Sequence, residues 1–178
     1  MKKQKSAIFK SVKMLVIAAM LTAMSVVIGI ICKSLLNFGN GLLRVTFENL
    51  PIIISGVLFG PIIGGLVGIA SDLVSYLLSP QTLPPNLVVT AGAMSVGIVS
   101  GIVAKFIVKS KGTKQIIFSA AAAHMVGSMI IKPIGLYQFY QWGVLLRIPL
   151  YLIIAPLEIL VICLLFKNKT FCRVTEYY

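Results

Sequence analysis

The distribution of basic residues along this chain constrains its fold more than any single motif does. No Lys or Arg occurs from Val45 to Ala104, and the basic residues gather almost entirely at the N-terminus, at residues 105–114 and at the C-terminus. Apolar stretches separated by basic clusters are typical of a chain threaded through a bilayer, because Lys and Arg are enriched in the loops on the cytoplasmic side. The pattern therefore predicts a membrane protein and indicates which loops share a side.

The composition favours the same class. Of the 178 residues, 58% are hydrophobic and 11% are charged, whereas a soluble domain has about 25% charged residues. The net charge of +12 does not indicate a nucleic-acid partner, because the basic residues flank apolar spans and do not alternate with aromatic residues on a polar face. We therefore expect the chain to lie in the lipid bilayer and to bind no nucleic acid.

Several familiar chemistries are absent from the sequence. The three cysteines are isolated, there is one His, and neither CxxC nor HxxxH occurs, so we expect no metal site and no cofactor. There is also no P-loop, HExxH or GxSxG motif, which argues against an ATPase or a familiar hydrolase. The run from Met14 to Cys32 resembles a signal peptide, but it has 19 uncharged residues and no small-x-small cleavage site. We interpret it as a retained first span.

The number of spans depends on one ambiguous stretch. Four clear spans are predicted at 14–32, 86–104, 115–131 and 148–166, each close to the ~20 residues that cross a bilayer as a helix. The stretch 49–79 has 31 residues and contains Gly60-Pro61, a pair that commonly ends one helix and opens another. It forms either one long span or two short ones, about 49–59 and 61–79.

Charge distinguishes the two possibilities. With one span at 49–79 and the N-terminus inside, Lys and Arg number 7 inside and 9 outside. With two spans, 12 lie inside and four outside, namely Lys33, Arg44, Lys132 and Arg147. The positive-inside rule favours the second arrangement. We therefore predict one all-α integral membrane domain over 1–178, a six-transmembrane-helix bundle in the cell membrane with both termini cytoplasmic.

Small residues recur at helical spacing in three predicted spans. Gly56, Gly60, Gly64, Gly68 and Asp72 are four residues apart, and Gly97 and Gly101 repeat that spacing. Helix faces made of small residues let helices approach closely in lipid, so we expect these glycines to pack within the bundle. Ala19 and Ala23 form another such face in the first span. From spacing alone, it serves either internal packing or the docking of a partner helix.

Two acids lie well inside apolar spans, where an ionised side chain is costly and marks a functional candidate. Asp72, near the outer end of its span, could bind N–H groups of a ligand or cap a neighbouring helix. For Glu158, near the middle of the last span, we favour a structural hydrogen bond. His124, Ser128 and Lys132 share one face of the fifth span.

The predicted outer surface combines cations with aromatic rings. The four outer cations face a single outer acid, Glu48, and the loop before Arg147 contains Tyr137, Phe139, Tyr140 and Trp142. The rings could form an interfacial belt while Lys132 and Arg147 extend to lipid headgroups. Alternatively, the groups line a pocket open to the outside. A planar heterocycle with an anionic tail would suit it, by ring stacking and by Arg–carboxylate pairing.

The chain resembles the substrate-binding S components of energy-coupling factor (ECF) vitamin transporters over essentially its whole length. The resemblance rests on the length, the six spans, the Ala19-xxx-Ala23 face, and the series Leu50-Pro51 through Gly56, Phe59-Gly60-Pro61, Gly64, Gly68 and Asp72. Within the family it is most similar to the folate-specific members, through Arg44-x-x-Phe47-x-x-Leu50-Pro51 and Arg147-x-Pro149.

The resemblance implies a division of labour. An S component captures a vitamin outside and docks onto a transmembrane coupling subunit and two ATPase subunits, so this chain would not itself be an enzyme. The Ala19 and Ala23 face would meet the coupling subunit. The folate tail would lie near the rim cations and the pterin among aromatic and polar groups. The candidate ligand residues are Arg44, Phe47, Asp72, Asn86, His124, Lys132, Tyr137 and Arg147.

Three alternatives stay open at this point. The same scaffold could serve another vitamin or a vitamin precursor. A membrane enzyme could use Asp72, His124 and Glu158, but these would have to converge, and Glu158 is predicted to lie deeper than the others. A membrane assembly protein would have no ligand at all.

Overall fold

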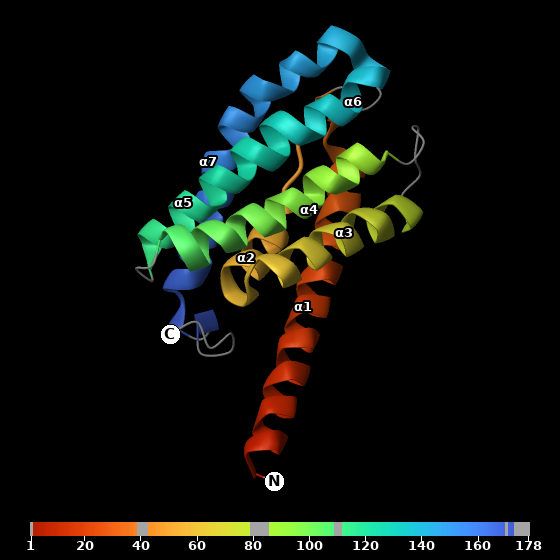
Figure 1. The fold of residues 1–178 in the computed structure, drawn as a ribbon. Helices are drawn as coiled ribbons and strands as arrows, with labels where there is room; N and C mark the ends of the chain where they lie inside the picture. Colours follow the sequence, from red (N-terminus) through yellow and green to blue (C-terminus); the bar gives the residue numbers. More distant parts are fainter. Residues whose placement is uncertain (1, 39–42, 79–85, 109–111, 170, 173–178) are drawn as a thin grey trace.

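The structure is a computed structural model that describes residues 2–38, 43–78, 86–108, 112–169 and 171–172. In this part of the chain nearly every residue is helical, and the strands β1 (Asn37–Phe38) and β2 (Leu43–Arg44) form a two-residue antiparallel pair. The helices run alternately up and down, and the start of α1 and the end of α7 lie toward the same end (Figure 1). The fold is thus an all-helical bundle, as the sequence predicted.

Helix α1 (Lys2–Leu35) is the longest single element and stands partly apart from the bundle. At 1.5 Å per residue, its 34 residues extend about 50 Å, against about 30 Å for the hydrocarbon layer. The apolar part, Val12–Leu35, is the segment suited to a membrane. The strands follow directly, and β2 lies beside α7, so the upper end of α1 is tied to the last helix of the bundle.

Helices α2 (Asn49–Phe59) and α3 (Pro61–Leu78) are separated by one residue, Gly60. Gly60 has a φ of 94°, a conformation that favours glycine, and Pro61 then begins α3, where a missing N–H costs nothing. With 11 residues, α2 is about 16 Å long and too short to cross a bilayer alone. Its Ile52, Ile53 and Ile54 are at most 1% exposed, because neighbouring helices enclose it.

Helix α4 (Leu87–Ile102), extended by the π-helical turn η1 (Val103–Ile107), lies against both α2 and α3. Glycines form the contact. A Cβ added to Gly64 would lie 2.5 Å from the carbonyl oxygen of Gly97 in α4 and 2.7 Å from the Cα of Gly56 in α2. The repeated glycines of α2, α3 and α4 therefore pack backbone against backbone, the structural role expected from their spacing.

The second half of the molecule is one long helical hairpin. Its rising arm comprises α5 (Thr113–Ala123), the π-helical segment η2 (His124–Ile131) and α6 (Lys132–Tyr140). The 3-10 turn η3 (Gln141–Leu146) reverses the chain, and α7 (Arg147–Lys167) descends beside α5 (Figure 1). Pro156 lies inside α7, two residues before Glu158.

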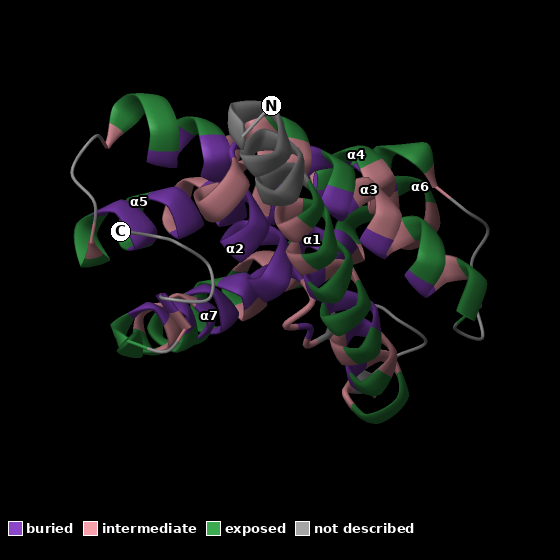
Figure 2. Ribbon diagram, turned by 90° about the horizontal axis from the view of Figure 1, so that it is seen from below, coloured by how far each residue is buried: buried purple, intermediate pink, exposed green. Residues whose placement is uncertain are grey.

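The burial pattern is that of a protein solvated by lipid. Buried residues concentrate on the helix faces that point into the bundle (Figure 2). Large aliphatic side chains such as Leu77, Leu87 and Ile62 are more than three-quarters exposed, whereas Ser100, Ser119 and Glu158 are 0% exposed. Within the described residues, four helical segments are long and apolar enough to cross a membrane: Val12–Leu35, Pro61–Leu78, Leu87–Ile107 and the hairpin Thr113–Lys167.

Candidate functional site

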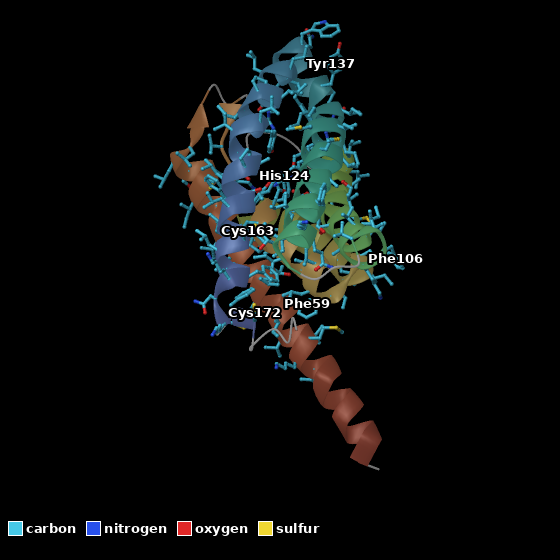
Figure 3. The ribbon with its side chains drawn as sticks, turned by 90° about the vertical axis from the view of Figure 1, so that its left-hand side faces the viewer. Phe59, Phe106, His124, Tyr137, Cys163 and Cys172 are labelled. Atoms are coloured by element: carbon cyan, nitrogen blue, oxygen red, sulfur yellow. The ribbon has the colours of Figure 1, made fainter. Side chains whose placement is uncertain are left out.

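A chain of buried polar side chains runs through the middle of the bundle. His124 Nε2 of η2 lies 2.7 Å from Glu158 Oε2 of α7, and both side chains are at most 1% exposed. On its other edge, His124 Nδ1 is 3.5 Å from Ser128 Oγ, and Ser128 accepts a hydrogen bond of 3.2 Å from Asn49. Figure 3 shows His124 about midway along the bundle. π-helical turns frequently occur at functional sites, and η2 supplies both His124 and Ser128.

The polar chain continues toward the upper end through Lys132. Its ammonium donates to Asn49 Oδ1 at 2.8 Å and lies 3.4 Å from Glu48 Oε1. Lys132 is 5% exposed, so its charge is held inside the bundle, which argues against the alternative that it extends to lipid headgroups. The cause is Gly92 of α4: a Cβ there would lie 2.6 Å from Lys132 Cγ. The missing side chain leaves room for the lysine stem to point inward.

A second polar cluster joins α3 to α4. Thr90, in the first turn of α4, donates a hydrogen bond of 2.6 Å to Asp72 Oδ2. Asn86 caps α4, since its Oδ1 accepts from the Val88 N–H at 2.9 Å, and its amide donates to the carbonyl of Gly135 in α6. Asp72 and Asn86 therefore hold the upper ends of α3, α4 and α6 together.

Aromatic side chains lie around the turn between α6 and α7. Tyr137 is 47% exposed, lies at the upper end of the molecule (Figure 3) and meets Trp142 edge-on, with 5.8 Å between ring centroids. Arg147, at the start of α7, places its guanidinium 5.6 Å from the Tyr140 ring centroid, within cation–π range. Arg147 therefore lies against one of the aromatic rings that precede it in the chain.

The remaining predicted ligand residues lie before α2. Phe47 is half-buried, and Arg44 is in β2, but the Arg44 side chain lies outside the described part of the structure. Lys33 of α1 donates to Ser75 Oγ at 2.7 Å, and Lys132 pairs with Glu48. Lys33 and Lys132 are thus bonded to polar groups of the protein itself, and Arg147 lies against the Tyr140 ring.

Ala19 and Ala23 are both exposed on α1. Ala19 lines an apolar groove of about 230 Å³ between α1 and α3, together with Ala18, Thr22, Leu66 and Ala70, among others. Small exposed residues on a helix leave room for a second helix to approach. In the described part of the chain, both alanine side chains are thus left exposed at this face.

The three residues considered for a membrane enzyme are divided between the two clusters. His124 and Glu158 do meet, contrary to the expectation that Glu158 lies deeper than His124. Asp72, however, is bonded to Thr90 in the other cluster. Within the described residues, no group of three His, Cys, Asp or Glu side chains is arranged to hold a metal ion.

Sequence reasoning missed three contributors to these clusters, Ser25, Asn49 and Thr90. It also missed Ser71, a buried serine whose Oγ has no hydrogen-bond partner among the described residues. Ser25 Oγ donates to the Glu48 carbonyl at 2.6 Å, and Asn49 joins Lys132 to Ser128. Asn49 carried one usable signal, because an amide at the start of an otherwise apolar run is buried with that run and needs partners. The serines carried none, since a single Ser is common in membrane helices.

Comparison with known proteins identifies the scaffold. A relative described as the folate transporter FolT of Clostridium novyi (strain NT) is 29% identical over 59 residues, which cover 33% of this chain. The chain spans 34% of the length of this curated relative in that match. Residues 13–174 match the family described as "ECF transporter, substrate-specific component". The chain therefore belongs to the family of substrate-specific components of ECF transporters.

Proposed function

We propose that this protein captures a folate-type vitamin at the outer face of the cell membrane and delivers it inward as the S component of an ECF transporter. The observation that carries the proposal is the family match over residues 13–174, and the relative described as a folate transporter supports the choice of vitamin. Energy would come from ATP hydrolysis on separate subunits, so this chain is a binding component and not an enzyme.

The proposed topology has six spans with both termini cytoplasmic. It is supported by the basic residues, of which 12 of 16 then lie inside, and by the shared end at which α1 starts and α7 ends. In this arrangement α2 is a short span enclosed by its neighbours, and the two arms of the α5–α7 hairpin are separate spans. The turn between α6 and α7 then faces outside, with its aromatic rings.

The ligand would bind at that outer end. Because Glu48 and Asn49 already neutralise and hold Lys132, we propose that Arg147, aided by Arg44 from the strand beside α7, receives the two carboxylates of the glutamate tail. Tyr137 and Phe47 offer surfaces for stacking. Lys132 and His124 would support the site from below through the buried polar chain.

The proposed docking face for the coupling subunit is the exposed side of α1 around Ala19 and Ala23. Its support is the groove beside Ala19 and the small size of both residues. A transmembrane helix with small side chains at the contact would fit there. Leu160, 55% exposed on α7, provides a matched position for bulky control substitutions away from this face.

Ligand-induced thermal stabilisation of the purified protein, measured without nucleotide across a panel of vitamins, tests the function. Folate should raise the melting temperature, and Arg147→Ala should weaken folate binding by about one to two decades, the value of a charge-assisted hydrogen bond of roughly 1.5–3 kcal/mol. Stabilisation by another vitamin but not by folate would show that the scaffold binds that vitamin instead of folate. No response to any vitamin would contradict the proposal.

A further inference from the structure

A small polar cavity lies where α1, the start of α2, α3 and α4 meet. Its volume is about 10 Å³, and it is lined by Ser25, Glu48, Ile52, Ser71, Asp72 and Ala93. This is about the space that one water-sized group occupies. The cavity can therefore receive a single small substituent, such as an amino group, but not a ring.

The wall of the cavity is rich in hydrogen-bond acceptors. Glu48 and Asp72 each bring a carboxylate, and a carboxylate offers about four lone-pair sites. Asp72 uses Oδ2 for the bond from Thr90. Ser25 donates its proton to the Glu48 carbonyl, so it presents lone pairs elsewhere. A group that enters this cavity must therefore bring N–H or O–H donors.

Ser71 adds an unsatisfied hydroxyl to the lining of the cavity. Its side chain is 3% exposed, and among the described residues its Oγ has no hydrogen-bond partner. Buried hydroxyls are nearly always hydrogen-bonded, and each exception calls for an explanation. A ligand group at the cavity would supply the missing bond.

The surrounding charges favour a neutral group over a cation. Lys132 pairs with Glu48. Lys33 bonds Ser75, one helical turn after Ser71. A Cβ on Gly29 would lie 3.0 Å from Glu48 Oε2 and 3.3 Å from Ser75 Oγ, which places Glu48 close to that lysine contact. Lys132 thus already offsets the Glu48 carboxylate, and Lys33 is bonded close by, so a cationic ligand group gains less here than beside two unpaired carboxylates.

We propose that this cavity is the subsite that binds an uncharged aromatic amino group of the vitamin, with Asp72, Glu48 and Ser71 as its partners. The inference rests on the proposed function and adds the chemical group that is recognised. The pterin ring of folate carries such an amine beside a ring N–H. Two of the three proposed partners are not fully enclosed, since Asp72 is half-buried and the Glu48 side chain keeps 15% exposure.

The test compares two ligands on the purified full chain: folate, and the analogue in which hydrogen replaces the 2-amino group. Wild type should bind the analogue about 10- to 100-fold more weakly than folate, as expected for hydrogen bonds to charged partners. In Ser71→Ala and Asp72→Asn, the ratio of the dissociation constant of the analogue to that of folate should shrink, because the amino group has lost hydrogen-bond partners. A purely structural effect would weaken both ligands alike and leave the ratio unchanged.

Ser119→Ala is the matched control. Ser119 is also fully buried, its Oγ has no partner among the described residues, and it lies in α5, outside the lining of this cavity. It should retain the full ratio. If wild type binds both ligands equally, or both variants keep its ratio, the subsite is wrong while folate binding stands. If wild type binds no folate, the proposed ligand fails and the subsite assignment fails with it.

Discussion

Replacing Gly64 with Ala tests whether the contact between α2, α3 and α4 tolerates one additional carbon atom. The new Cβ would lie 2.5 Å from the Gly97 carbonyl oxygen and 2.7 Å from the Gly56 Cα, whereas ordinary van der Waals contact begins near 3.4 Å. Helix α4 would thus have to retreat by about 0.9 Å, the difference between 3.4 and 2.5 Å. Both neighbours are backbone atoms, so no side-chain rotation relieves the clash.

The expected cost follows from that displacement. A gap of 0.5–1 Å removes about a quarter to a half of the dispersion energy of each separated atom pair, and overpacking a core typically costs about 1–3 kcal/mol. Alanine recovers about 1 kcal/mol through its higher helix propensity. Because the backbone cannot yield locally, we place the clash at the upper end of the range and expect Gly64→Ala to lower the unfolding free energy by about 2 kcal/mol.

The neighbouring residue provides the control. A Cβ on Gly65 would meet the side chain of Ile98, with Cγ1 at 2.8 Å, and that side chain can move. Gly65→Ala should therefore stay within about 1 kcal/mol of wild type, since the same gain in propensity offsets a smaller clash. Unfolding in mixed micelles with rising SDS content, followed by circular dichroism, measures both. Equal stabilities for the two variants would refute the argument from backbone contact.

Glu158→Leu leaves His124 buried without its partner and should cost about 1–3 kcal/mol in the same unfolding assay, and His124→Phe in the same chain should recover most of this loss. Equal stability of the single and double variants would show that a buried His124 without Glu158 does not lower the unfolding free energy. Ala23→Trp should abolish uptake and co-purification of the coupling subunit while folate affinity changes only a few-fold, because the bulk blocks a partner helix. Normal uptake by the Ala23→Trp variant would exclude this face of α1 as the docking site of the coupling subunit. For topology, a single cysteine replacing Tyr137 should react with an impermeant maleimide from outside, and one replacing Thr113 should not. Outside labelling at Thr113 would overturn the orientation.

The candidate site was predictable in its residue types but less so in its contacts. The spacing of His124, Ser128 and Lys132 placed them on one face, and the structure shows them in one polar chain. Their partners could not be predicted, because a helical period gives the relative direction of residues within one helix and not the rotation of that helix against its neighbours. The sequence identified Glu158 as an acid whose ionised form would be unfavourable inside an apolar span. Its contact with His124 could not be predicted, because it depends on how α7 packs on η2.

The amino-acid pattern alone is enough to predict a lipid environment and the order of the helices along the chain. Charge-free apolar runs of about 20 residues are stable as helices in lipid, and Gly60-Pro61 ends one helix and begins the next at that point in the chain. The position of the Lys132 ammonium, in contrast, depends on how the helices pack against one another. Its long stem can reach either headgroups or the bundle interior, and the choice depends on Gly92 of another helix, which leaves space for it, and on Asn49 and Glu48, which hold its charge. Such a choice depends on contacts between residues far apart in the chain, and local pattern does not encode them.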